Sequence, residues 1–159
     1  MGAVSLQNLS GFTLLKSPTK VKNLAENAKK KGYSAIALTD INITYGLVDF
    51  YKAAKDIGIK PLLGMQLRIN GLIDEANKYD LIAIAKDDQG YKNILRLSSA
   101  VNLLTENGEK ENVLTLEDLK KYLGHLILIT PSNLHSELKM LQTNNPKMGA
   151  NYIQLDLLQ

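Results

Sequence analysis

The stretch Gly32–Leu67, GYSAIALTDINITYGLVDFYKAAKDIGIKPLLGMQL, decides the fold of this 159-residue chain. It predicts a buried strand over Ser34–Thr39, a helix over Gly46–Ile57 and a second strand over Ile59–Leu67. A strand, a helix and a strand at this spacing are typical of a βαβ unit in a parallel sheet. Asp40 directly follows the first strand, and in α/β folds this end of a strand is where ligands and metals bind.

Outward from this unit, the chain continues to alternate between strands and helices. Ser17 and Pro18 predict a helix start, one as the cap and the other as the first helical residue. A turn or hairpin is predicted between Leu67 and Asp80. Further strands are predicted over Val4–Leu9, Asp80–Ala85, Leu126–Thr130 and Tyr152–Leu157, and further helices over 89–104, 115–123 and 132–141. This order predicts an α/β fold with a mainly parallel sheet, either doubly wound or a barrel.

The composition is that of an ordinary globular protein, with 45% hydrophobic and 22% charged residues. The net charge of +3 is compatible with a nucleic-acid partner but does not require one. The absence of cysteine excludes disulfides, thiolate zinc sites and cysteine nucleophiles. No apolar run approaches the roughly 20 residues of a membrane span, and no signal peptide is visible. We therefore expect a cytoplasmic protein with no membrane partner.

Two carboxylates at predicted strand ends, Asp40 and Asp80, are candidate ligands for Mg²⁺ or Mn²⁺. The alternative is that Asp40 caps the loop Ile41–Tyr45, as aspartate does in turns. Nothing nearby in the sequence supplies a third or fourth ligand, which favours this alternative. His125 and His135 lie on different predicted elements without a second histidine at metal-ligand spacing, which favours ordinary structural or surface roles.

The run Ala35–Leu67, with its GIKPLLG turn, and the segment Asp80–Leu97, with its GYKNI motif, resemble the PHP (polymerase and histidinol phosphatase) domains. Within that superfamily they are similar to the domain at the amino terminus of bacterial DNA polymerase III alpha subunits. Val4–Ser17, Leu126–Thr130 and Tyr152–Leu155 match further segments of this family in order. The resemblance implies a distorted seven-stranded (βα) barrel with a metal cluster at the carboxyl ends of its strands.

A domain of this type has about 250–280 residues, the scale of a single barrel domain. We therefore expect residues 1–159 to be the N-terminal portion of a PHP domain, in a fragment of a longer polymerase chain. A buried strand predicted close to Gln159 favours the same interpretation, because parallel strands are normally covered by helices.

The resemblance also implies where metal ligands would lie. Family members with an intact centre carry a His-x-His motif near their start, a Thr-Asp-His motif, a glutamate after the GIKP turn and a histidine before the next strand. The corresponding residues here are Gln7, Leu9, Asp40, Ile41, Gln66 and Asp80. Only the aspartate of the Thr-Asp-His motif is kept.

The substituted residues are poor ligands for a hydrolytic metal centre. Such a centre needs several imidazoles and carboxylates to hold its ions and to lower the pKa of a bound water. Leu9 and Ile41 donate nothing, and glutamine amides are weak, neutral ligands. We expect no metal in this chain, with Asp40 and Asp80 as weak candidates only, and no catalytic residue.

The resemblance implies that the parent chain is a DNA-directed DNA polymerase, a nucleotidyltransferase active in DNA replication, with Mg²⁺ at a site outside these residues. This domain would be an inactive platform that contacts the remainder of the polymerase chain and accessory or exonuclease subunits of the replisome, with DNA reached through the parent chain. The alternative is a metal-dependent 3′–5′ exonuclease or phosphoesterase with a divergent site. A third possibility is a free-standing nucleic-acid-binding module that uses Lys29–Lys31.

Overall fold

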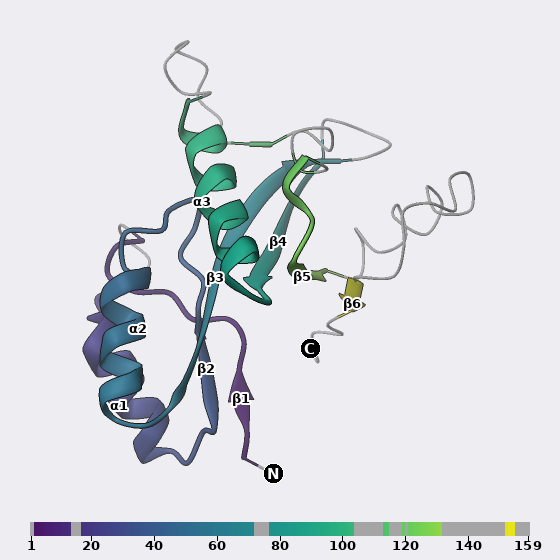
Figure 1. Ribbon diagram of the computed structural model, residues 1–159. Coiled ribbons are helices and arrows are strands. Elements are labelled where there is room, and N and C mark those ends of the chain that lie inside the picture. Colours follow the sequence, from purple (N-terminus) through teal and green to yellow (C-terminus); the bar gives the residue numbers. More distant parts are fainter. Residues whose placement is uncertain are drawn as a thin grey trace.

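The computed structural model describes residues 2–13, 17–71, 77–103, 113–114, 119, 121–131 and 152–154. Figure 1 labels the helices and strands of this part of the chain. The helices are α1 (Val21–Lys30), α2 (Leu47–Asp56) and α3 (Asp88–Leu103). The strands are β1 (Val4–Ser5), β2 (Ala35–Leu38), β3 (Lys60–Asn70), β4 (Lys78–Ala85), β5 (Leu126–Thr130) and β6 (Tyr152–Gln154). The predicted βαβ unit is therefore present as β2, α2 and β3.

The strands form one curved sheet in the order β1-β2-β3-β4-β5-β6, which makes a half-barrel with helices (Figure 1). The β1–β2, β2–β3 and β5–β6 pairs are parallel, whereas the β3–β4 and β4–β5 pairs are antiparallel. The α/β fold is confirmed, and the prediction of a mainly parallel sheet is confirmed only in part. The reason is connection length: only residues 71–77 separate β3 from β4, too few for a crossover helix.

β3 joins the two halves of the sheet. Its residues Lys60–Leu63 pair with β2, and Gly64–Asn70 pair with β4. Gly64 stands where the partner changes, and a Cβ there would lie 2.7 Å from the carbonyl oxygen of Ala83. Glycine therefore allows the two backbones to approach closely at this point.

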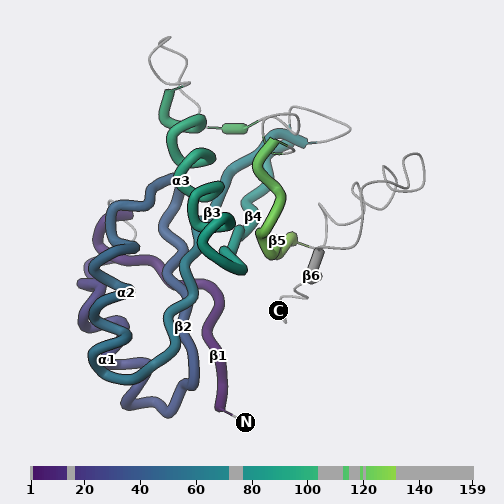
Figure 2. Tube along the Cα trace, viewed as in Figure 1, coloured from purple at the N-terminus to yellow at the C-terminus, as the bar shows by residue number. Residues whose placement is uncertain are grey.

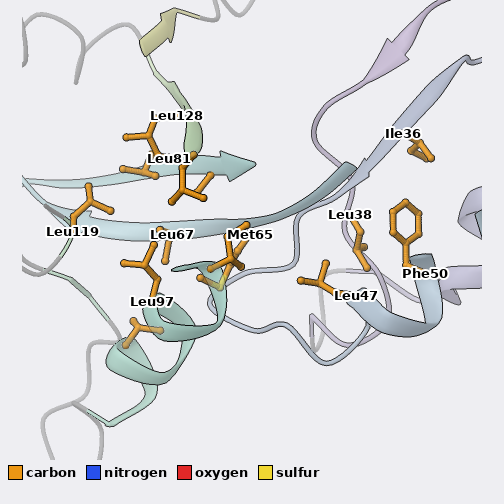
Figure 3. Close-up of a cluster of buried hydrophobic side chains, with 14 of the residues drawn as sticks. Ile36, Leu38, Leu47, Phe50, Met65, Leu67, Leu81, Leu97, Leu119 and Leu128 are labelled. Carbon is orange, nitrogen blue, oxygen red and sulfur yellow. The ribbon is translucent and has the colours of Figure 1, made fainter. Parts of the chain in front are cut away.

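Side chains of β3 alternate between the two faces of the sheet. Met65 and Leu67 lie beneath the helices, where they share a cluster with Leu47 of α2 and Leu97 of α3 (Figure 3). The opposite face lines the inside of the half-barrel and carries a smaller cluster, formed by Ala37, Ile82, Ile84 and Ile129. Because burying one such aliphatic side chain contributes about 1.5–3 kcal/mol, the helix-covered face supplies most of the apolar stabilisation.

α1 and α2 pack side by side along β2 (Figure 2). Each is followed by a glycine with positive φ, 77° at Gly32 and 69° at Gly58, in the conformation that ends helices. Lys29 Nζ donates a hydrogen bond to the carbonyl oxygen of Gly58 at 3.1 Å. The first residue of the lysine run therefore ties the two helix ends together.

The predicted start of the first helix is wrong. α1 begins at Val21 rather than at Pro18, and Lys20 before it has an extended backbone with no side-chain cap. Ser17 Oγ instead accepts a hydrogen bond from the Thr19 amide at 3.2 Å. Ser17 thus stabilises a local turn, as serine hydroxyls do outside helices, and the helix starts one turn later.

Other strand predictions differ from the structure at their ends. The first strand covers only Val4–Ser5 of the predicted Val4–Leu9, and β4 begins at Lys78, so Asp80 is its third residue. The predicted helix over 132–141 and His135 lie outside the described residues, as does most of the helix predicted over 115–123. Among the helices that the structure describes, none is long and apolar enough to cross a membrane.

Candidate functional site

The six positions singled out by the sequence lie at one end of the half-barrel. β2 and β3 are parallel, and their pairing continues past β2 through a bridge between Ile41 and Gln66. The Gln66 amide donates to the carbonyl oxygen of Asp40 at 3.1 Å. Because β4 runs antiparallel to β3, its start lies at the same end, with Asp80 directly opposite Arg68.

The segment after β1 brings the first two positions to this end. The amide of Thr39 donates to the carbonyl oxygen of Asn8 at 2.9 Å. The Asn8 side chain donates in turn to the carbonyl oxygen of Ala37 at 3.0 Å. These contacts hold Gln7 and Leu9, the neighbours of Asn8, against the end of β2.

Asp40 is buried and hydrogen-bonded to the loop that follows β1. It is 2% exposed. Its Oδ1 accepts from the Ser10 amide and from Thr13 Oγ1, each at 2.7 Å, and its Oδ2 accepts from Ser10 Oγ at 2.6 Å. Distances this short are typical of hydrogen bonds to an ionised carboxylate. Both oxygens of Asp40 therefore have protein donors.

These contacts correct the interpretation that Asp40 caps the loop Ile41–Tyr45. The hydrogen-bond partners of the carboxylate are instead Ser10 and Thr13, about thirty residues earlier in the chain. Asp40 is linked to the loop after β2 only through Thr13, whose Oγ1 donates to Asp40 and accepts from the Ile41 amide at 3.2 Å. Asp40 thus fastens the N-terminal loop to the sheet.

Four other side chains form a second hydrogen-bonded arrangement, which we call the polar chain: Gln7, Gln66, Asp80 and Arg68. Gln7 Nε2 donates to Gln66 Oε1 at 3.2 Å, and Gln66 Nε2 donates to Asp80 Oδ2 at 3.2 Å. Arg68 completes it by donating from Nε to Asp80 Oδ1 at 2.9 Å and from Nη2 to Asp80 Oδ2 at 3.2 Å. The structure therefore joins three of the six positions directly.

The remaining two positions are apolar. Leu9 and Ile41 are both half-buried, and neither offers an atom that could bind a cation. Within the part of the chain that the structure describes, no three histidine, aspartate or glutamate side chains are arranged to hold a metal ion. The side-chain oxygens of Asp40, Gln66 and Asp80 instead accept hydrogen bonds from amides, hydroxyls and a guanidinium group.

Arg68 is the residue of this site that the sequence did not reveal. It stands two residues after Gln66 on β3 and therefore faces the same side of the sheet. A correct prediction of the antiparallel hairpin register would have placed it opposite Asp80. The sequence predicted a hairpin between Leu67 and Asp80, but its register was set by contacts that the sequence does not show.

A third carboxylate forms a separate cluster at the start of α3. Asp87 Oδ1 accepts from the Gly90 amide at 2.9 Å, and Oδ2 lies 2.7 Å from His125 Nδ1. The Gly90 hydrogen bond, followed by that to His125, lowers the pKa of Asp87 below its ordinary value of 3.8. A Cβ on Gly90 would overlap the carbonyl oxygen of His125. The His125 side chain thus pairs with Asp87 at the surface, which agrees with the ordinary structural or surface role that the sequence favoured.

A cavity of about 770 Å³ lies where β3 changes partner, between the ends of α2 and α3. Its walls come from both faces of the sheet and include Leu62, Leu63, Tyr51, Tyr91 and Ile129. The volume is within the range of small-molecule pockets. None of the six positions lines it, so this cavity is separate from the candidate site.

The comparisons with known proteins agree on one family. The family model described as "PHP domain" matches residues 5–156. The chain is 34% identical to the DNA polymerase III subunit alpha of Halalkalibacterium halodurans over 154 residues, which cover 97% of this chain and 13% of that protein. It is 37% identical to the DNA polymerase III subunit alpha of Bacillus subtilis over 131 residues, which cover 82% of this chain and 11% of that protein.

The fold has a solved counterpart. An amidohydrolase from Chromobacterium violaceum, solved with bound sulfate and no metal, superimposes with a TM-score of 0.65 at 13% identity, over 94% of this chain and 75% of that one. At this identity the likeness concerns the fold alone. The chain spans only about a tenth of the polymerase subunits that it resembles in sequence.

Proposed function

Since this chain belongs to the PHP domain family, we propose that it is the N-terminal portion of the PHP domain of a DNA polymerase III alpha subunit, where it acts as a metal-free structural platform. The identity to polymerase subunits over most of the chain supports the parentage. The metal-free role is supported by the contacts at the candidate site, and above all by the two carboxylates.

The single observation that carries the proposal is that Asp40 and Asp80 both have protein donors on both oxygens. A metal ion binds carboxylate lone pairs, so it would have to displace these donors. At Asp40 the displaced groups would be buried, because Ser10 and Thr13 are themselves buried. Leaving a buried donor without a partner costs about 1–3 kcal/mol each. Binding would therefore begin with an unfavourable rearrangement.

The donor set also does not fit the group that the family's ligand motifs imply. A hydrolytic centre with two or three ions needs several imidazoles and carboxylates. Here Leu9 and Ile41 supply none, and Gln66 already bonds through both ends of its amide. A half-filled polar cluster in a protein interior is destabilising, so apolar replacements at two positions favour a stable metal-free domain.

We further propose that the parent chain carries out template-directed DNA synthesis with Mg²⁺ at a site elsewhere, and that this domain packs against other parts of it. The small share of the relatives' length that it spans supports a role within a larger chain. Accessory and exonuclease subunits are the proposed partners, with DNA reached through the parent chain. The cytoplasm is the proposed location.

Isothermal titration calorimetry with Mn²⁺ and Zn²⁺ tests the metal-free role. The 159-residue chain is expected to show no saturable binding tighter than about 1 mM. The matched positive control restores the family's ligands through Gln7→His, Leu9→His, Ile41→His, Gln66→Glu and Asp80→His, and should gain affinity. Micromolar binding by the unmodified chain, abolished by Asp80→Asn, would refute the proposal.

The rival function is metal-dependent 3′–5′ exonuclease or phosphoesterase activity. A 5′-labelled single-stranded DNA and a chromogenic phosphodiester, each incubated with the chain and Mn²⁺, provide the assay. The platform role predicts the same background rate for the chain and for Asp40→Asn and Asp80→Asn variants purified in parallel. Turnover that either variant loses would favour the enzyme over the platform.

A further inference from the structure

We propose that Arg68 takes the place of a metal cation at this site, because its guanidinium neutralises Asp80 and completes the polar chain. The inference rests on the proposed metal-free function and names the residue that keeps the site free of metal. It follows from the contacts of Arg68, its place on β3 and the chemistry of its neighbours.

The first support is geometric. Arg68 donates to both oxygens of Asp80, at 2.9 and 3.2 Å, in the two-pronged arrangement that suits arginine and carboxylate. The two residues are directly opposite each other in the β3–β4 register. The pairing is therefore fixed by the sheet and does not depend on two freely moving side chains meeting.

The second support is the surroundings of the pair. Gln66, itself buried, donates its amide to the same carboxylate and accepts from Gln7. Three positions that correspond to ligands in intact family members are thus hydrogen-bonded in series, from Gln7 through Gln66 to the negative charge of Asp80, and the positive charge beside it comes from the protein. A divalent ion at this place would meet a guanidinium group at close range.

The third support is electrostatic. At a given separation, a divalent ion is repelled by the guanidinium group twice as strongly as a monovalent ion would be. Arg68 also occupies the lone pairs that an incoming ion would need. Removing the guanidinium should free Oδ1 of Asp80 and leave Gln66 as the remaining donor to Oδ2. A carboxylate oxygen is a hard ligand of the kind that Mn²⁺ accepts.

The test compares Mn²⁺ affinity by calorimetry in the 159-residue chain and its variants. Arg68→Gln removes the charge, and Arg96→Gln is the matched control because Arg96 is exposed on α3. We expect Arg68→Gln to bind Mn²⁺ at least about tenfold more tightly than the unmodified chain. Arg96→Gln should stay within about twofold of it.

Two further variants test whether the gain in Mn²⁺ affinity depends on Asp80 and on the positive charge of the side chain at position 68. Arg68→Gln combined with Asp80→Asn should lose the gained affinity, and Arg68→Lys, which keeps the charge, should bind as weakly as the unmodified chain. Thermal melts with and without Mn²⁺ provide a second readout, in which only Arg68→Gln is stabilised by the ion. Equal affinities for Arg68→Gln and Arg96→Gln, or a gain that survives Asp80→Asn, would overturn the role of Arg68.

This design separates the two proposals. Tight Mn²⁺ binding by the unmodified chain would refute the metal-free platform, whatever Arg68 does. The ratio of affinities between Arg68→Gln and Arg96→Gln reports on Arg68 alone. If Arg68→Gln unfolds, as circular dichroism would reveal, Arg68→Met replaces it in the same comparison, because methionine keeps an unbranched side chain but carries no charge. A Mn²⁺ affinity of Arg68→Met equal to that of Arg96→Gln would then overturn the proposal.

Discussion

Asp40 and Asp80 lie at the same end of the half-barrel, yet the protein accommodates their charges differently. Asp40 is 2% exposed and accepts only from neutral donors, two of them on Ser10 and one on Thr13. The Asp80 side chain is 35% exposed and faces a cation, Arg68, whose side chain is 45% exposed. One carboxylate is held by the interior and the other by a partly solvated ion pair.

The difference shows which of the two charges the fold depends on. Solvent screens the Asp80 pair, and exposed ion pairs contribute about 0–1 kcal/mol. The contacts of Asp40 are buried, so losing the carboxylate would leave several polar groups without partners. We infer that Asp40 is retained because it holds the N-terminal loop, whereas Asp80 and Arg68 adjust the charge of the site.

The largest expected effect comes from removing the buried carboxylate. Asp40→Ala deletes three hydrogen bonds and leaves the hydroxyls of Ser10 and Thr13 without the acceptor to which they donate. We therefore expect it to lower the free energy of unfolding by about 3–5 kcal/mol. Urea denaturation monitored by circular dichroism measures this loss. Asp56→Ala, at an exposed position near the end of α2, is the control and should change stability by less than about 0.5 kcal/mol. An equally small loss of stability for Asp40→Ala and Asp56→Ala would contradict the inference that the fold depends on the Asp40 carboxylate.

An intermediate effect is expected from a single donor of Asp40. Thr13→Val keeps the shape of the side chain but removes the hydroxyl that donates to Asp40 and accepts from the Ile41 amide. We expect a loss of about 1–3 kcal/mol in the same urea experiment, since Ser10 keeps its two bonds. In the Asp40→Ala background, Thr13→Val should cost much less, and full additivity would contradict the direct contact.

A smaller effect is expected from the exposed pair. Asp80→Asn should destabilise the protein by less than about 1 kcal/mol, and added sodium chloride should reduce the difference because it screens exposed charges. Denaturation at low and high salt measures both quantities. A loss as large as that of Thr13→Val, with no response to salt, would mean that Asp80 behaves as a buried group.

The smallest effect concerns the third carboxylate, Asp87, whose pKa lies below 3.8. Because the folded pKa is below the unfolded one, its stabilising contribution is present above pH 3.8 and is lost as the pH falls through the folded pKa. Carbon-detected NMR of the carboxyl group against pH measures this value. His125→Gln should raise the pKa only part of the way to 3.8, because the Gly90 amide, the larger cause, remains. Complete restoration would assign the shift to His125 instead.

The sequence predicted the features that depend on neighbouring residues. The apolar run Ser34–Thr39 and the spacing of β2, α2 and β3 follow from local backbone preferences and side-chain periodicity. The candidate positions were named from the family resemblance instead, and Leu9 and Ile41 cannot donate to a metal wherever the fold puts them.

The errors arose where a polar side chain could form hydrogen bonds with more than one set of partners. Ser17 has the chemistry of a helix cap, yet it bonds to Thr19 within a turn. Asp40 has the chemistry of a loop cap, yet its carboxylate bonds to Ser10 and Thr13. In both cases the residue type was informative about hydrogen bonding, but it did not specify the partner.

The sequence by itself determined the α/β alternation, the family and the small number of residues at the candidate positions that could bind a metal. Only the tertiary structure decided how the surviving polar groups pair. Asp40 meets Ser10 across 30 residues of chain, Gln7 meets Gln66 across 59, and Arg68 meets Asp80 across 12. Such partners are chosen by strand register and loop placement, which depend on the packing of the whole sheet and not on any one segment.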